Sequence, residues 1–268
     1  MRVRPLAEPA RIEHFFRRSC NLEFDASPLV QGAWSTTEQH VAPSLGLLTH
    51  VMEEEAARRH GGRFQLTRLC FDILGTFPIG PVTCTVSVVR PGRTIELLEG
   101  RLSCAGRLVI VSRAWFAQKY ETMAIAGSTL SKIASADEMR LWNMSEHWPG
   151  ACIAAMNVRR RSITEDRAWA WIDTAVELVA GEAIGATARA MTMVDLANGT
   201  ALRLEPGTIA YPNLDLTAHM FRKPRNGMLG LDTTVSVGGS GVGMNNSTMH
   251  DADGPYGVVT QTLTIRPR

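Results

Sequence analysis

Hydrophobic and polar positions change their period along the chain, first helical and then alternating. From about residue 43 to 59 the apolar residues recur at helical spacing, with Leu45, Leu48 and Met52 in one stripe. Gly61-Gly62 follows the basic end of this stretch and is a stop signal for a helix. The pattern predicts one amphipathic helix.

The residues after this helix alternate with the period of a strand. Four such stretches, separated by Pro- and Gly-containing turn signals, predict an antiparallel meander. They are residues 64–74, 82–89, 94–104 and 108–116.

The same order returns later in the chain. It comprises an alternating stretch at 168–178, a helix at 181–194, and strands at 209–221, 229–237, 243–249 and 257–265. The turn glycines of the two halves can be overlaid with one residue of slip, which indicates an internal repeat. We expect an α+β fold, in which two repeats of a curved antiparallel sheet each wrap around a central helix. The expected parts are an N-terminal unit at 1–118, a linker at 119–166 and a C-terminal unit at 167–268.

Composition narrows the class of protein. The net charge is +2 and aromatic residues make up 6% of the chain, so neither nucleic acid nor a membrane surface is favoured as a partner. No apolar run reaches the length of a membrane span, and the first residues lack the apolar core of a signal peptide. The five cysteines form no Cys-x-x-Cys pair, which is typical of reduced core residues in the cytoplasm. The seven histidines show no metal-ligand spacing, so we expect no metal site.

One carboxylate stands inside a predicted strand. Tyr211 to Arg222 alternates, and Asp215 falls on the same face as Thr217 and His219. Aspartate is a poor strand former and is costly to bury without partners. Asp215 therefore belongs either to a solvated face or to a functional site.

Both halves carry short motifs in a definite order. They are Pro78-Ile-Gly-Pro-Val82 and Val88-Val-Arg-Pro-Gly-Arg93 in the first half, and Met193-Val-Asp-Leu-Ala-Asn-Gly199, Pro212-Asn-Leu-Asp-Leu-Thr217 and Gln261-Thr-Leu-Thr-Ile-Arg-Pro-Arg268 in the second. Taken together, the chain resembles thioesterase-like double-hotdog proteins of the acyl-CoA thioesterase II type. The resemblance covers nearly the whole chain apart from its first 25 residues or so and the linker.

The resemblance implies hydrolysis of an acyl thioester. In that family an Asp, a Thr or Ser, and a Gln hold the attacking water. Carried over to this chain, the Asp is Asp215, the Gln is Gln261, and the hydroxyl is Ser236 or Thr234. The implied substrate is an acyl-CoA or acyl-carrier-protein thioester, with CoA as part of the substrate and no other cofactor.

Three further residues are candidates for substrate binding. His40 precedes the first helix, whose first turn can hold a thioester oxygen, although a surface or capping role is the alternative. Asp195 with Asn198 can line the pocket or simply close a helix end. His219 shares the face of Asp215 and can contact substrate or be structural.

Two other functions stay open on the same fold. An acyl-thioester dehydratase or hydratase would use an Asp/His pair, which His219 beside Asp215 allows. A non-catalytic acyl-binding protein is the second, because His40-Val-Ala42 stands where the family carries glycines. We also expect a homo-oligomer, since the faces and edges of such sheets are usually covered by symmetry.

Overall fold

The computed structural model describes residues 13–201, 203 and 207–267. The N-terminal residues, which lack the apolar core of a signal peptide, lie outside the described residues. Within them, no helix has the length and apolar character needed to cross a membrane.

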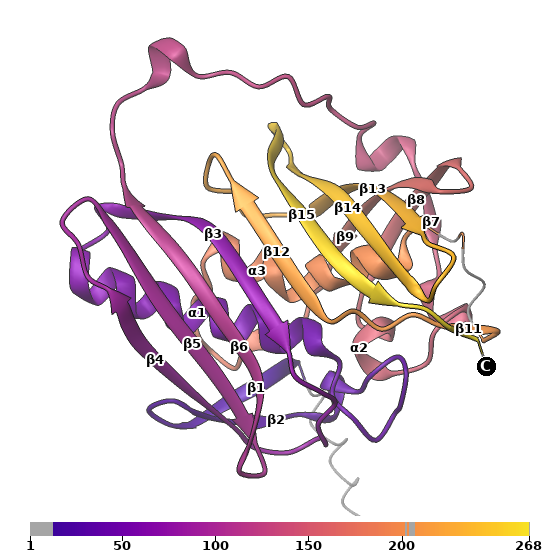
Figure 1. Cartoon of the computed structure of the whole chain (residues 1–268), viewed down its shortest axis with the longest axis horizontal. Coiled ribbons are helices and arrows are strands. Elements are labelled where there is room, and N and C mark those ends of the chain that lie inside the picture. Colours follow the sequence, from indigo (N-terminus) through magenta and orange to yellow (C-terminus); the bar gives the residue numbers. More distant parts are fainter. Residues whose placement is uncertain (1–12, 202, 204–206, 268) are drawn as a thin grey trace, which may run out of the picture.

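Fourteen of the described strands form one continuous sheet that curves around the helices (Figure 1). The strands of the first half are β1 (His14–Cys20), β2 (Glu23–Ala26), β3 (Phe64–Ile73), β4 (Val82–Arg90), β5 (Ile95–Cys104) and β6 (Arg107–Gln118). Those of the second half are β7 (Arg140–Trp142), β8 (Asn157–Thr164), β9 (Arg167–Asp173), β10 (Glu177–Val179), β12 (Asp215–Met220), β13 (Leu229–Val237), β14 (Val242–Asp251) and β15 (Gly254–Thr264). Strands β11 (Ile209–Ala210) and β16 (Arg266–Pro267) pair separately.

The two halves join where β3 pairs with β12. The antiparallel register runs from Asp215 opposite Asp72 to His219 opposite Arg68. The strand order is β10-β1-β2-β4-β5-β6-β3-β12-β15-β14-β13-β9-β8-β7, so each half places its meander on its own side of this joint. One sheet thus serves both units.

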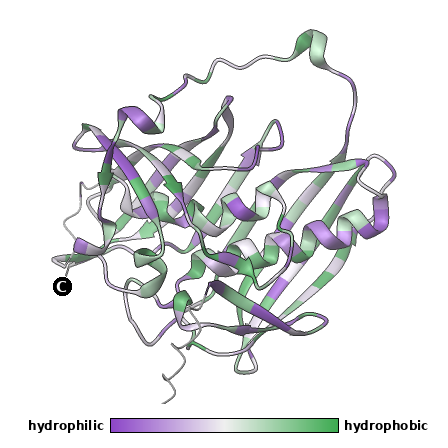
Figure 2. Cartoon of the chain, turned by 180° about the vertical axis from the view of Figure 1, so that it is seen from behind, coloured by the Kyte–Doolittle hydropathy of each residue, from purple (hydrophilic) through white to green (hydrophobic). Residues whose placement is uncertain are grey.

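The helices are α1 (Val41–His60), α2 (Ala151–Ala154) and α3 (Ala186–Val194), with short 3-10 turns that include η1 (Pro28–Val30), η4 (Met144–Glu146) and η5 (Asp195–Gly199). Helix α1 begins after His40, whose side chain accepts the Ala42 N–H, and ends at Gly61 in the left-handed conformation that glycine tolerates. Seen from behind, α1 crosses the strands and carries hydrophilic and hydrophobic stretches side by side (Figure 2). Its apolar stripe, including Leu45, Leu48 and Met52, is fully buried.

Helices α1 and α3 pack directly on each other. A Cβ at Gly46 would lie 2.1 Å from the Oγ1 of Thr192, so a glycine is required for this approach. The packing brings the last turn of α3 to the first turn of α1. That is the place where the candidate site forms.

The expected fold class is confirmed, and both helices and all eight meander strands are present at nearly the predicted positions. The expected linker is only partly irregular. Residues 119–139 arch over the top of the sheet in Figure 1, but β7, α2 and β8 follow within the predicted 119–166 segment. Strand β8 pairs with β9, although its Arg-rich sequence, Val158 to Arg161, hides the alternation. The boundaries of the units stay a prediction.

Candidate active site

A cavity of about 400 Å³ opens beside the first turn of α1. It is formed by the loop before α1, the end of β3 with the loop that follows, and the segment just before β12, so both halves contribute. Its lining includes Trp34, His40, Leu74, Asp195, Asn213 and Arg266.

Asp195 is the central polar group of this cavity. It follows α3 at the start of η5 and is 5% exposed. Its Oδ1 accepts the side-chain N–H groups of Asn213 at 2.7 Å and of Gln261 at 2.6 Å. Burial raises the pKa of Asp195, and the nearby His40 together with the two amide donors opposes that rise. A buried carboxylate with a raised pKa and two fixed donors is suited to accept a proton.

Gln261 reaches Asp195 from β15 and is held from its other side. Asn245 of β14 stands opposite Gln261 in the ladder and donates from Nδ2 to its Oε1 at 2.6 Å. Both side chains are 1% exposed. The Asn245 bond fixes the orientation of the Gln261 amide, so that its N–H groups point toward Asp195.

His40 approaches Asp195 from the opposite side. Its Nδ1 accepts the Ala42 N–H at 3.2 Å and lies 3.9 Å from the Asp195 Oδ2. Burial lowers the pKa of His40, although the Asp195 charge acts in the opposite direction, and this shift favours the neutral ring. A neutral ring that accepts at Nδ1 carries its proton on Nε2. The positive end of the α1 dipole faces the same place.

Asp215 lies elsewhere, on the outward row of β12 with Thr217 and His219. Its Oδ1 accepts the Thr262 backbone N–H at 2.7 Å. Thr217 pairs with Thr260 but Asn213 with Leu263, so β12 carries one extra residue there, a β-bulge. The carboxylate satisfies a backbone donor at this irregularity, and no bond joins it to Gln261.

The remaining residues that the sequence predicted for the site lie outside the Asp195 group as well. Ser236 and Thr234 are exposed on β13, where the Thr234 hydroxyl donates to the Asn246 carbonyl at 3.3 Å. His219 is exposed beside a shallow groove on the outer face of the sheet. The structure therefore brings together Gln261, Asp195 and His40, and it leaves Asp215, Ser236, Thr234 and His219 outside this group.

Two members of the group are absent from the sequence-based set, Asn213 and Asn245. Asn213 stands two residues before Asp215, within the motif Pro212 to Thr217, and the bulge turns it toward Asp195. Asn245 belongs to an Asn-Asn pair in the middle of a strand, where asparagine is disfavoured. That mismatch with strand propensity was the available signal.

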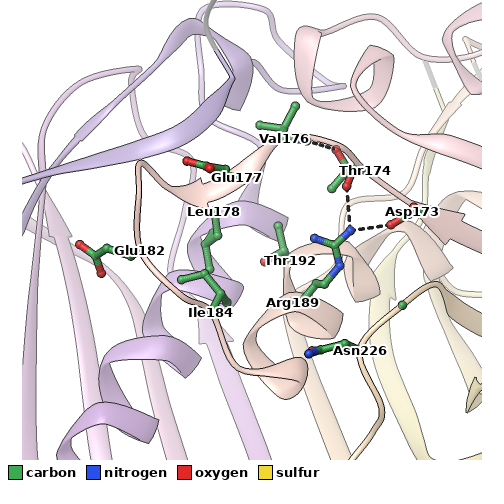
Figure 3. Close-up of a pocket in the computed structure, with 11 residues that line it drawn as sticks. Asp173, Thr174, Val176, Glu177, Leu178, Glu182, Ile184, Arg189, Thr192 and Asn226 are labelled. Atoms are coloured by element: carbon green, nitrogen blue, oxygen red, sulfur yellow. Dashed lines mark hydrogen bonds and ion pairs between the residues drawn. The ribbon is translucent and has the colours of Figure 1, made fainter.

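A second cavity, of about 520 Å³, lies between α3 and the β9–β10 segment (Figure 3). Its polar wall is a closed network, because Arg189 binds the Asp173 carboxylate at 2.6 Å and the Thr174 carbonyl at 2.8 Å. Glu177 and Glu182 add negative charge at its rim. Among the described residues that line it, this cavity therefore offers no unpaired cation to a phosphate.

One group of described side chains has metal-ligand spacing: His50, Glu54 and Glu182. Arg18 already donates to both carboxylates, at 3.0 Å to Glu54 and 2.7 Å to Glu182. Its hydrogen bond lowers the pKa of Glu182. A guanidinium thus supplies the positive charge there.

Known solved structures share this architecture. A hot dog fold protein of unknown function from Alicyclobacillus acidocaldarius is 12% identical, with a TM-score of 0.72 over 94% of this chain and 96% of that chain. An acyl-CoA thioesterase II, TesB2, from Mycobacterium marinum is 14% identical, with a TM-score of 0.67 over 94% and 96%. The dehydratase domain from the CurF module of a curacin polyketide synthase is 12% identical, with a TM-score of 0.53 over 83% and 84%. At these identities the likeness shows the fold.

Family models are more specific. A model of the acyl-CoA thioesterase N-terminal domain matches residues 30–117, and a model of the C-terminal domain matches residues 130–265. No curated protein matches the sequence. The two domain models occur in order and span most of the chain, including every member of the Asp195 group. The chain therefore belongs to the acyl-CoA thioesterase family and has its double-hotdog fold.

Proposed function

We propose that the protein hydrolyses an acyl thioester and that Asp195 is the base that activates the water. The supporting observation is the buried Asp195 carboxylate, held by Asn213 and Gln261 in a cavity at the first turn of α1. The role that the family resemblance gave to Asp215 thus passes to Asp195. Asn213 takes the place that we had assigned to Ser236 or Thr234.

The reaction follows from these groups. Asp195 takes one proton from the water as its oxygen bonds to the thioester carbonyl carbon. The C–S bond then breaks, and the leaving thiolate takes the proton from Asp195. The products are a carboxylic acid and a free thiol. Asn213 and Gln261 fix the carboxylate, which lowers the entropic cost of aligning the water.

The thioester oxygen needs a donor as negative charge develops on it. The Ala42 N–H is occupied by the His40 ring, and Pro43 has no N–H. The His40 ring is one available donor, because a ring that accepts at Nδ1 carries its proton on Nε2. We assign the Nε2–H as the oxyanion donor, assisted by the α1 dipole.

Replacing each aspartate by asparagine tests this assignment. Asp195→Asn removes the base, and we expect release of free thiol from acyl-CoA substrates to fall by at least about 100-fold. Asp215→Asn is the matched control, since asparagine keeps the Oδ1 that binds the Thr262 N–H. Loss of turnover in Asp215→Asn with activity retained in Asp195→Asn would return the catalytic role to Asp215.

A dehydratase or hydratase is the second candidate function, with His40 and Asp195 as the acid/base pair in place of His219 and Asp215. His40 and Asp195 face each other at 3.9 Å from the two halves of the chain, an acid/base pair suited to move a proton and a hydroxyl. Incubation with an enoyl-CoA separates the two reactions. Added water with no free thiol would support the hydratase, whereas free thiol supports the thioesterase.

Several finer expectations belong to this proposal. The carrier of the acyl group is CoA or an acyl-carrier protein, and exposed Arg266 at the cavity mouth is a candidate contact for its phosphate. A purely acyl-binding protein would bind such thioesters without turnover. The cytoplasmic location and the homo-oligomer stay predictions.

A further inference from the structure

A small chamber lies behind the Asp195 group. It has a volume of about 30 Å³ and shares Ala33, Trp34, His40 and Asp195 with the larger cavity. The two spaces therefore meet at the residues to which the proposed function assigns the chemistry.

The chamber is closed on its inner side. Met144 and Trp148, from the segment between the two units, form its wall together with Ile153, and each is no more than 4% exposed. Gly199 completes the wall, where a Cβ would lie 2.7 Å from Met144 Cε and 3.3 Å from the Trp148 ring. A space of this size holds about two or three non-hydrogen atoms, since a single water needs about 10–15 Å³.

Two buried polar atoms of the lining have no hydrogen-bond partner among the described residues. They are the Tyr211 hydroxyl and the Asn198 Oδ1. Tyr211 is 3% exposed, and its ring packs edge-on against Trp34 at 5.2 Å. The Asn198 Nδ2 donates to the Tyr211 carbonyl at 3.0 Å, so the amide is fixed with Oδ1 away from that bond. Unpaired buried polar atoms are costly, so a water or a polar group of a bound substrate is favoured as their partner.

The two arms of a thioester have different requirements at this junction. The CoA or carrier arm is long and must reach solvent, and the larger cavity has the room for it. The acyl arm is then directed into the chamber. We propose that the chamber is the acyl subsite, and that it selects thioesters of short acyl chains bearing a hydroxyl group next to the carbonyl. Such a hydroxyl donates to Asn198 Oδ1 and accepts from the Tyr211 hydroxyl.

The inference rests on the proposed thioesterase activity, and a substrate series tests both. Thiol release would be measured with glycolyl-, lactoyl-, acetyl-, butyryl- and octanoyl-CoA. We expect kcat/KM to be highest for the two hydroxyacyl substrates, about tenfold above acetyl-CoA, the effect of one or two substrate hydrogen bonds. Octanoyl-CoA should be turned over least.

Tyr211→Phe tests the polar recognition, because it removes the hydroxyl and keeps the ring against Trp34. We expect the ratio of kcat/KM for glycolyl-CoA to that for acetyl-CoA to fall about tenfold. The matched control is Tyr120→Phe, at a tyrosine that is 64% exposed, where the ratio stays at its original value.

Trp148→Ala tests the size limit, since it removes the back wall. Butyryl- and octanoyl-CoA should gain relative to acetyl-CoA. Trp142→Phe, at the neighbouring ring that packs on Trp148 at 6.2 Å without lining the chamber, should leave the ranking as it was. If Trp148→Ala does not fold, the Tyr211→Phe ratio still decides.

The outcomes are separable. Turnover that rises with chain length, or a Tyr211→Phe ratio equal to that of the parent, overturns the acyl subsite and leaves the hydrolase standing. Thiol release from no member of the series overturns the proposed function and this inference together.

Discussion

Asp195 is a carboxylate that must ionise in a place that opposes ionisation. It is almost fully buried, and its two donors are neutral amides rather than cations. The neutral form is therefore favoured more than in water, which raises the pKa of Asp195. If Asp195 is the base, as proposed, the fold gives up stability here to keep it beside the cavity.

The cost of burying the Asp195 charge predicts that Asp195→Asn stabilises the protein while it abolishes activity. Because the pKa of Asp195 is raised in the folded state, the folded protein binds more protons at this group than the unfolded chain. The stability therefore falls as the pH rises from the unfolded-state pKa of Asp195 through its folded-state pKa. Asp195→Asn avoids that loss and keeps an oxygen for Asn213 and Gln261. We expect its Tm at pH 7 to exceed that of the parent by roughly 2–4 °C, and the difference to vanish near pH 3. Thermal unfolding across pH measures this, and a lower Tm for the variant at pH 7 would contradict it.

We expect a substitution at Asn245 to lower the reaction rate, although Asn245 acts on Asp195 only through Gln261. Its Nδ2 fixes the Gln261 amide, so Asn245→Asp, which offers only acceptors, should turn that amide around. Gln261 would then present an oxygen to Asp195, and we expect kcat to fall on the order of 100-fold. The same loss of donors should raise the pKa of Asp195 and move the acidic limb of the rate profile to higher pH.

The neighbouring residue supplies the control for that experiment. Asn246 is exposed on the opposite face of β14. Asn246→Asp introduces the same charge on the same strand and should leave kcat and the pH profile at parental values. Equal losses in both variants would assign the effect to charge on the strand rather than to Gln261.

The sequence predicts which residue types belong to the site better than it predicts which side chains face the cavity. Gln261 and Asp195 were both found, the first by family motif and the second as a helix-end candidate. Asp215 is the base that the family motif implies, and the alternation gives no sign of the extra residue between Asn213 and Thr217. Because of that residue, Asn213 turns inward toward Asp195 while Asp215 stays on the outer face of β12.

At the scale of elements, a regular hydrophobic period is sufficient to predict a helix or strand, but the lack of a period does not show that a segment is irregular. Helix α1 and strands β3 to β6 have uninterrupted patterns and were placed almost to the residue. Strand β8 falls in the predicted linker because its sequence shows no clear period. It pairs near the sheet edge, where one side of each strand is solvated and arginine is tolerated. The short wall segments around Met144 and Trp148 have no period at all, although they shape the chamber.

The contact between α1 and α3 predicts a strong effect of one methyl group. Alanine normally stabilises a helix by about 1 kcal/mol over glycine. In Gly46→Ala, however, the new Cβ would meet Thr192 at 2.1 Å, so we expect a net loss of about 1–3 kcal/mol in the free energy of unfolding. Because this contact brings Asp195 to α1, thiol release should fall as well.

A second substitution separates the clash from other effects. Thr192→Ala removes the Oγ1 that faces Gly46 and should recover part of the stability lost in Gly46→Ala, as measured by denaturant unfolding in a double-mutant cycle. Additive losses would show that the clash with Thr192 is not the cause.

At the scale of the whole molecule, the site exists only because the two halves are joined. His40 comes from the first unit, and Asp195, Asn213 and Gln261 come from the second. The joint is made by the β3–β12 ladder, the β1–β10 pairing and the α1–α3 contact rather than by the connecting chain. The sheet ends in the three-residue strands β10 and β7, which present little edge for further pairing. The homo-oligomer, if formed, must therefore use other surfaces.

This arrangement predicts that the connection can be cut. Residues 119–129 are exposed, and a Cβ at Gly127 would meet no atom within 4 Å. The chain is anchored again only at Ser131 and Ala134, whose carbonyls contact His250 at 3.0 Å and Trp171 at 2.8 Å. We expect a protease site inserted at Gly127 to be cleaved quantitatively, and the two fragments to co-elute and retain thiol release within about twofold, since packed surfaces rather than the loop hold the halves. The uncleaved insertion variant is the control.

Separation of the fragments, or loss of turnover on cleavage alone, would show that the joint needs the covalent link. In that case the high local concentration that the linker provides would be what keeps His40 at Asp195.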